Sequence, residues 1–230
     1  MYHKTSTEHH IALSPETKAW GSVIWLHGLG ADGHDFAPIV PELKLHNDLP
    51  LRFIFPHAPM QPVTINNGYV MRAWFDIQSM DIHQKIDEKG IHASIQIVNG
   101  LIQTEVDAGI PIEKIVLAGF SQGAVIALMA GLHYPKSLAG IMALSGFLPH
   151  AESLLTKANP ANATTPIFIG HGREDFVVPF PLGERTADVL IKNHYNVTAK
   201  YYSIAHTVSL EEINDISRWL KDLYQKSNAY

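Results

Sequence analysis

The alternation of short apolar runs with longer amphipathic stretches is the feature that most constrains the fold of this chain. The runs short enough to be buried strands are 22–26, 52–55, 114–118, 139–144, 166–169 and 197–203. The stretches with the pattern of helices are 91–106, 122–132, 182–193 and 210–224. Strands that alternate with helices are typical of a parallel sheet covered by helices. The pattern therefore predicts an α/β fold with a mostly parallel central sheet and helices on both faces.

Two segments between these elements show neither helical nor strand periodicity. Residues 58–82 contain Pro59, Pro62 and Gly68 and are expected to form a lid-like or substrate-binding excursion. Residues 150–165 are expected to be a second loop. Residues 1–18 are polar at first and are treated as an N-terminal segment. With 230 residues, 46% of them hydrophobic, the chain is expected to form a single domain over 1–230.

Composition excludes several classes of function. The chain has no cysteine, which excludes disulfides, thiolate metal sites and a cysteine nucleophile. Its 17 basic and 22 acidic residues leave a formal charge of -5, so no nucleic-acid partner is expected. No apolar run resembles a signal peptide or a membrane span, and a cytoplasmic protein is expected. Although there are 14 histidines, no H-E-x-x-H spacing appears, and we expect neither a metal nor a cofactor.

A candidate nucleophile lies between the strand 114–118 and the helix 122–132. Residues 119–123 read Gly-Phe-Ser-Gln-Gly and match G-x-S-x-G, the motif of a serine on a sharp strand-to-helix turn. Glycines on both sides of Ser121 would let the strand and the helix approach closely. The motif alone also permits an ordinary turn with an idle serine. The order of the other polar groups favours a nucleophile.

A serine hydroxyl needs an imidazole to take its proton and a carboxylate to orient that imidazole. His206 is the histidine that lies after the last predicted strand and before the last helix, where such a base is expected. Glu174 and Asp175 both follow the strand 166–169, and spacing leaves both open, with a preference for Asp175. His27 and His171 each end a strand before a glycine, where they are expected to support the site.

A glycine-rich turn, residues 27–33, follows the first predicted strand. A turn at this position lets backbone N–H groups face the oxyanion that develops during acyl transfer. The expected donors are the N–H groups of Leu29 and Gln122. A phosphate-binding loop is the competing interpretation, but the G-K-[ST] ending of such a loop is absent.

Six apolar residues are expected on loops at the carboxyl ends of strands or in the excursion, the edge at which open α/β sheets bind ligands. They are Trp74, Phe75, Phe147, Leu148, Phe176 and Val177. For each of them singly, a place in the core is favoured over a place in a ligand site. As a set they predict an apolar groove that binds an acyl chain.

With these residues assembled, the chain resembles the phospholipase/carboxylesterase family, which includes bacterial carboxylesterases and acyl-protein thioesterases. The matching segments are 26–33, 72–76, 119–123, 144–149, 171–179 and 206–212. The resemblance implies an α/β-hydrolase fold with Ser121, Asp175 and His206 as a catalytic triad. It also implies that Leu29 and Gln122 form the oxyanion hole.

The resemblance further implies a carboxylesterase that cleaves short- to medium-chain acyl esters through an acyl-enzyme. The alternatives are an acyl-protein thioesterase or lysophospholipase, with an acylated protein or a lysophospholipid as substrate, and a catalytically silent binding module. Homodimers are common in the family. The chain departs from the family at residues 203–205, which read Ser-Ile-Ala where a Gly-Met-Gly-like stretch is frequent, and at Ala124, where glycine is frequent.

Overall fold

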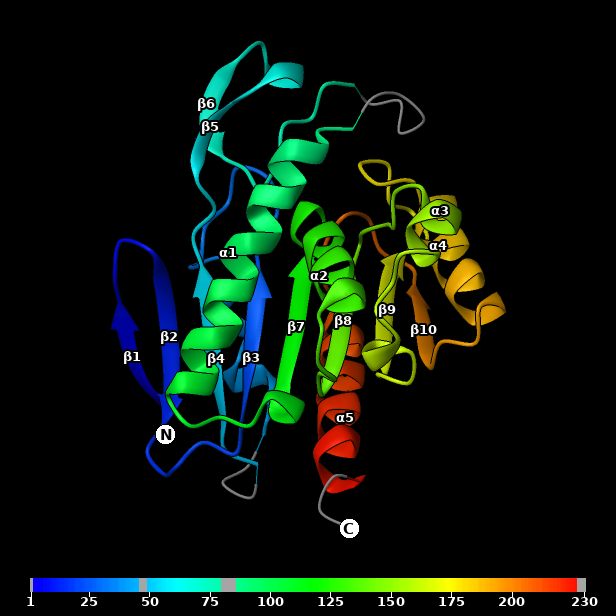
Figure 1. Cartoon of the computed structure of the whole chain (residues 1–230). Helices are drawn as coiled ribbons and strands as arrows, with labels where there is room; N and C mark the ends of the chain where they lie inside the picture. The colour runs from blue at the N-terminus through cyan, green and yellow to red at the C-terminus, as the bar shows by residue number, and fades with distance from the viewer. Residues whose placement is uncertain (1, 46–48, 80–85, 227–230) are drawn as a thin grey trace.

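Eight strands form one sheet in this computed structural model, which describes residues 2–45, 49–79 and 86–226. The strand order is β1-β2-β4-β3-β7-β8-β9-β10 (Figure 1). The strands are β1 (Tyr2–Ser6), β2 (His10–Pro15), β3 (Gly21–Leu26), β4 (Leu51–Pro56), β7 (Ile115–Phe120), β8 (Gly140–Leu144), β9 (Ile167–Gly172) and β10 (Val197–Tyr202). In this order, all neighbouring strands from β4 across the sheet to β10 run parallel. The pairs β1–β2 and β2–β4 are antiparallel.

Helices cover both faces of the sheet. They are α1 (Glu88–Asp107), α2 (Gln122–His133), α3 (Ala151–Leu155), α4 (Phe180–Lys192) and α5 (Leu210–Lys226). Successive residues of one strand face opposite sides, so Leu117 packs with α1 and α2 while Val116 packs with α5. The predicted α/β arrangement is therefore confirmed. In the part of the chain that the structure describes, no helix is long and apolar enough to cross a membrane.

The N-terminal segment differs from the expectation of a polar tail. It forms β1 and β2, which extend the sheet beyond β4. Ile11 and Ala12 are fully buried, but β1 is almost entirely exposed and is ordered by its backbone pairing with β2. Backbone pairing leaves no apolar periodicity in the sequence of β1, which is why the pattern did not indicate this strand, whereas β2 has a short apolar run, residues 11–13, that was not predicted as a strand.

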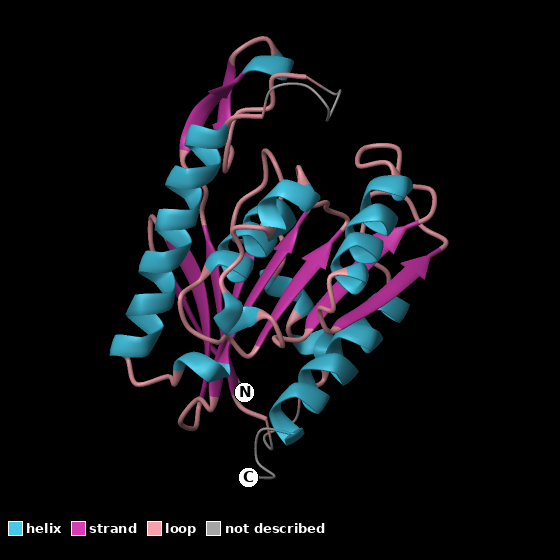
Figure 2. Cartoon of the chain, turned by 45° about the vertical axis from the view of Figure 1, so that its right-hand side comes forward, coloured by secondary structure: helices cyan, strands magenta, loops and turns pink. Residues whose placement is uncertain are grey.

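The excursion 58–82 contains a two-stranded hairpin, β5 (Met60–Val63) and β6 (Tyr69–Arg72). The hairpin rises beyond the carboxyl edge of the sheet, on the side where α1 begins (Figure 2). Residues 80–82 of the predicted excursion lie outside the described residues. The second predicted loop, 150–165, is partly helical, because it contains α3 and a short 3₁₀ turn at Pro160–Asn162.

A buried carboxyl group lies in the first turn of α5. The N–H of Glu212 donates to Ser209 Oγ at 3.1 Å, which caps the N-terminus of the helix. The Glu212 carboxyl, however, is fully buried and has no hydrogen-bond partner among the described residues. Its burial, reinforced by the negative charge of Asp215, raises the pKa of Glu212 to about 8. The group is therefore mainly protonated at neutral pH.

We predict that the free energy of unfolding falls as the pH rises from about 4.5 to 8, because the unfolded chain releases the Glu212 proton first. The contribution that is lost is on the order of 4 kcal/mol for a pKa raised to about 8. Glu212→Gln removes this titration. Urea unfolding at pH 5 and pH 8.5 should show that the variant gains stability relative to the wild type at the higher pH. If the free energies of unfolding of the variant and the wild type differ by the same amount at both pH values, Glu212 does not titrate as proposed.

Candidate active site

Ser121 lies at the junction of β7 and α2 in a left-handed backbone conformation, with φ 55° and ψ -118°. A Cβ at Gly119 would lie 2.2 Å from the Gly123 carbonyl oxygen, and one at Gly123 would lie 2.4 Å from that of Leu26 in β3. No residue with a side chain fits at either position without a shift of the backbone. The two glycines thus allow the crossing of strand and helix that holds Ser121 in this strained conformation.

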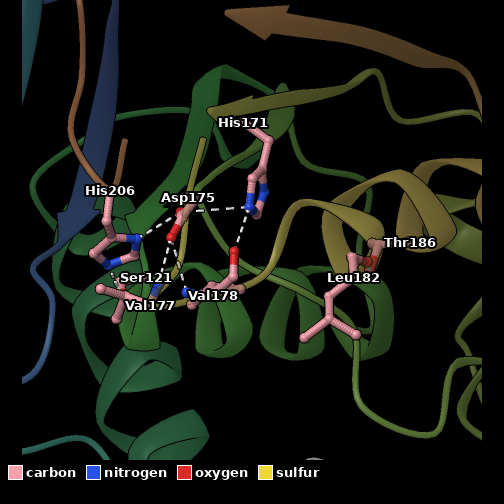
Figure 3. A network of polar contacts seen from close by, with 8 residues as sticks. All are labelled: Ser121, His171, Asp175, Val177, Val178, Leu182, Thr186 and His206. Carbon is pink, nitrogen blue, oxygen red and sulfur yellow. Dashed lines mark hydrogen bonds and ion pairs between the residues drawn. The ribbon is translucent and has the colours of Figure 1, made fainter. Parts of the chain in front are cut away.

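Two loops bring an imidazole and a carboxylate to Ser121. His206 follows β10, and its Nε2 lies 2.9 Å from Ser121 Oγ. Asp175 follows β9, and its Oδ2 lies 2.7 Å from His206 Nδ1 (Figure 3). Glu174 is exposed, whereas the Asp175 side chain is fully buried, so Asp175 is the acid that faces His206. A carboxylate only accepts hydrogen bonds, so Nδ1 carries a proton and Nε2 can accept that of the serine.

The glycine-rich turn 27–33 lies directly beside the serine. A Cβ at Gly28 would come within 3.4 Å of Ser121 Cβ. Among the described residues, neither the Leu29 N–H nor the Gln122 N–H donates to another backbone group in a turn or loop. Residues 28–33 spell G-x-G-x-x-G, but they lead to a 3₁₀ turn at Ala37–Ile39 instead of an α-helix whose N-terminus could hold a phosphate.

The His27 side chain fixes the orientation of the peptide unit that carries the Leu29 N–H. Its Nδ1 donates to the Gly28 carbonyl at 2.6 Å, and its Nε2 accepts the Ala58 N–H at 3.0 Å. The Gly28 carbonyl and the Leu29 N–H belong to one planar peptide, so holding the first sets the direction of the second. Burial lowers the pKa of His27 to about 4, which keeps the ring neutral and able to accept at Nε2.

The excursion is joined to this turn through Trp74 and Gln122. Trp74 Nε1 donates to the His27 carbonyl at 2.9 Å. The Gln122 side chain accepts the Trp74 N–H at 2.8 Å and donates to the Phe75 carbonyl at 2.7 Å. The residues that carry both expected oxyanion donors are thus linked by buried hydrogen bonds. Sequence reasoning expected support from His27 but missed this contact with the excursion.

The six apolar residues expected to form a groove differ in burial. Trp74, Phe75 and Leu148 are buried, with 1%, 8% and 5% exposure, and their place in an acyl-binding groove stays a prediction. Phe147 is half-buried, while Phe176 and Val177 are 87% and 55% exposed beside Asp175. Large apolar side chains on loops at this edge close the core as often as they line a ligand site.

Both departures from the family pattern fit the local packing. A Cβ at Gly146 would lie 2.4 Å from the Ala124 methyl group, so the absence of a side chain at Gly146 leaves space for this methyl group. In the loop 203–205, the carbonyl oxygens of Ile204 and Ala205 lie against Gly172, where a Cβ would be 2.3 and 2.4 Å away. The loop before His206 is thereby held on the end of β9.

Residues 7–224 match the model of the phospholipase/carboxylesterase family. Acyl-protein thioesterase 1 of Yarrowia lipolytica is 37% identical over 206 residues, which cover 87% of this chain and 91% of the relative. Acyl-protein thioesterase 1 of Neurospora crassa is 40% identical over 216 residues, covering 89% and 87%.

Solved structures of similar proteins share the fold. Arabidopsis thaliana SOBER1 superposes with a TM-score of 0.83 at 33% identity and covers 89% of this chain and 99% of its own. Zea mays acyl-protein thioesterase 2 has a TM-score of 0.83 at 32% identity and covers 93% and 98%.

We predict that Trp74→Ala lowers the free energy of unfolding by about 3–5 kcal/mol, because it empties a fully buried site and removes the bond to the His27 carbonyl. The remaining folded enzyme should lose activity on acetyl and octanoyl esters by the same factor. Denaturant unfolding and kcat/KM for both esters test this. A loss confined to octanoyl esters would instead place Trp74 in an acyl groove.

Proposed function

The chain belongs to the phospholipase/carboxylesterase family, and from this premise we propose that Ser121, His206 and Asp175 hydrolyse acyl esters and thioesters through an acyl-enzyme. The similarity to its relatives identifies the chain as an esterase- or thioesterase-type hydrolase. The roles of the individual residues are what we propose. The observation that carries these roles is the His206 ring, which bridges Ser121 Oγ at 2.9 Å and Asp175 Oδ2 at 2.7 Å.

In the first half of the proposed reaction, His206 Nε2 takes the proton of Ser121 Oγ as the oxygen attacks the acyl carbonyl carbon. The negative charge that develops on the carbonyl oxygen is stabilised by the N–H groups of Leu29 and Gln122. Asp175 stabilises the imidazolium. His206 then donates its proton to the leaving oxygen or sulfur, and the bond to the acyl carbon breaks.

In the second half, a water molecule takes the place of the leaving group. His206 accepts a proton from this water as it attacks the acyl-enzyme, and then returns a proton to Ser121 Oγ as the carboxylic acid departs. Both halves require a neutral imidazole that can accept a proton at Nε2.

For the natural substrate, we propose an acyl group in thioester linkage to a protein, with small carboxylic esters as further substrates. The relatives named acyl-protein thioesterases support this choice over a general carboxylesterase. A second support is the exposed apolar pair Phe176 and Val177, which lies beside Asp175 and not inside the core. An open apolar rim suits a bulky acylated partner better than a small ester enclosed by the enzyme.

We predict that Ser121→Ala lowers kcat/KM at least about a thousandfold on p-nitrophenyl acetate, an acylated peptide thioester and a lysophospholipid alike. A fluorophosphonate probe should label the wild type and leave the variant unlabelled. Retention of activity and labelling by Ser121→Ala would refute the role of this serine. Absence of turnover and labelling in the wild type would favour a silent binding module.

We predict that Phe176→Ser lowers kcat/KM for an acylated protein about fivefold, since a partly buried phenyl ring at a contact contributes about 1 kcal/mol. Because this side chain is 87% exposed in the free enzyme, p-nitrophenyl acetate should be cleaved at nearly the wild-type rate. Ile191→Ser, which changes a 52% exposed apolar residue near the end of α4, is the matched control. If Phe176→Ser lowers kcat/KM equally for both substrates, or if Ile191→Ser lowers it as much for the acylated protein, Phe176 does not contact the acylated protein.

A further inference from the structure

His171, the penultimate residue of β9, places a second imidazole beside the Asp175 carboxylate. Its Nε2 lies 2.9 Å from the Val178 carbonyl oxygen and 3.4 Å from Asp175 Oδ2 (Figure 3). The side chain is fully buried and points toward Asp175 and Val178 (Figure 3), so it is closed off from solvent. The proposed mechanism does not use this ring.

The surroundings of His171 define where its proton lies. A carbonyl oxygen only accepts, so the 2.9 Å contact with Val178 requires a proton on Nε2. In the described part of the chain Nδ1 has no hydrogen-bond partner, and it faces Gly183 of α4, where a Cβ would be 2.2 Å away. A proton on Nδ1 would be a buried donor without an acceptor. Burial also lowers the pKa of His171, in agreement with a neutral ring.

Asp175 depends on this ring because its carboxylate is buried. Oδ1 accepts the N–H groups of Val177 and Val178, both at 2.9 Å, and Oδ2 accepts from His206. The His171 N–H donates to the carbonyl of Val178, the same residue whose N–H binds Oδ1, and its Nε2 lies 3.4 Å from Oδ2. Asp175, Val178 and His171 thus form a closed ring of contacts. A buried carboxylate that accepts several N–H groups is held in one orientation.

We infer that His171 is a positioning residue of this hydrolase, whose neutral N–H holds Val178 and thereby the loop that binds the Asp175 carboxylate and directs Oδ2 at His206. The inference rests on the proposed roles of Ser121, Asp175 and His206. A cationic side chain in place of His171 would draw charge from Asp175 and weaken its support of the imidazolium. A neutral donor supplies the hydrogen bond without that cost.

The direct test compares His171→Leu, which removes the N–H, with His171→Gln, whose amide can present an N–H at a similar reach. The leucine variant should lose about ten- to a hundredfold in kcat on p-nitrophenyl acetate, the range typical when a group that orients a reacting residue is removed. KM should change less than about twofold, and the glutamine variant should recover most of the loss. The low-field proton resonance of His206 Nδ1, assigned by its absence in His206→Gln, should shift in the leucine variant.

Ala187→Gly provides the control for a merely structural effect, because it destabilises the same helix that packs on His171 without contacting Asp175. It should lower the melting temperature and leave kcat unchanged. If His171→Leu does not fold, Gly183→Ala takes its place, since the added methyl group would displace the His171 ring while keeping all polar groups. It should lower kcat in the same way.

The inference is overturned if His171→Leu keeps the wild-type kcat and the wild-type His206 resonance. It is equally overturned if the leucine and glutamine variants lose the same activity in proportion to their loss of stability. Ser121→Ala, assayed in parallel, distinguishes a failure of the proposed function from a failure of the proposed role of His171. An active Ser121→Ala refutes the proposed function itself, whereas an inactive Ser121→Ala with an unaffected His171→Leu refutes only the role of His171.

Discussion

The close crossing of β3, β7 and α2 is the constraint on which the rest of the site depends. At Gly119 and Gly123 the backbones leave no space for a Cβ, and Ser121 between them takes a left-handed conformation with φ 55°. This conformation directs Oγ out of the carboxyl edge of the sheet and starts α2 immediately after it. Every other functional group is brought to Ser121 by a loop that leaves the same edge.

Two sets of buried hydrogen bonds connect those loops to the sheet. On one side, the Gln122 side chain binds the excursion at Trp74, whose indole binds the turn at His27. On the other side, Asp175 is bound by its own loop and by His206. A parallel sheet makes this arrangement possible, since β9 and β10 are neighbours and the loops that follow them lie side by side.

The sequence predicts those parts of the structure that depend on local pattern. The buried parallel strands are largely apolar, and the order along the chain is enough to propose Ser121 and His206 with an acid between them, whereas the choice of Asp175 over Glu174 rests on the family resemblance. The edge strand β1 is less visible because pairing orders it more than burial does, whereas β2 lies between β1 and β4 and has a short buried apolar run, residues 11–13. The burial of Trp74 and the bond from Ala58 to His27 depend on segments 31 or more residues apart, which no periodicity reveals.

The central claim is that hydrolysis proceeds through an acyl group covalently bound to Ser121. Rapid-quench mass spectrometry of the enzyme mixed with an acyl thioester tests it directly. We expect an adduct with the mass of the acyl group on the peptide that contains Ser121. The adduct should form and disappear at rates compatible with turnover, and it should be absent in Ser121→Ala. Turnover without such an adduct, or an adduct on another residue that persists in Ser121→Ala, would contradict it.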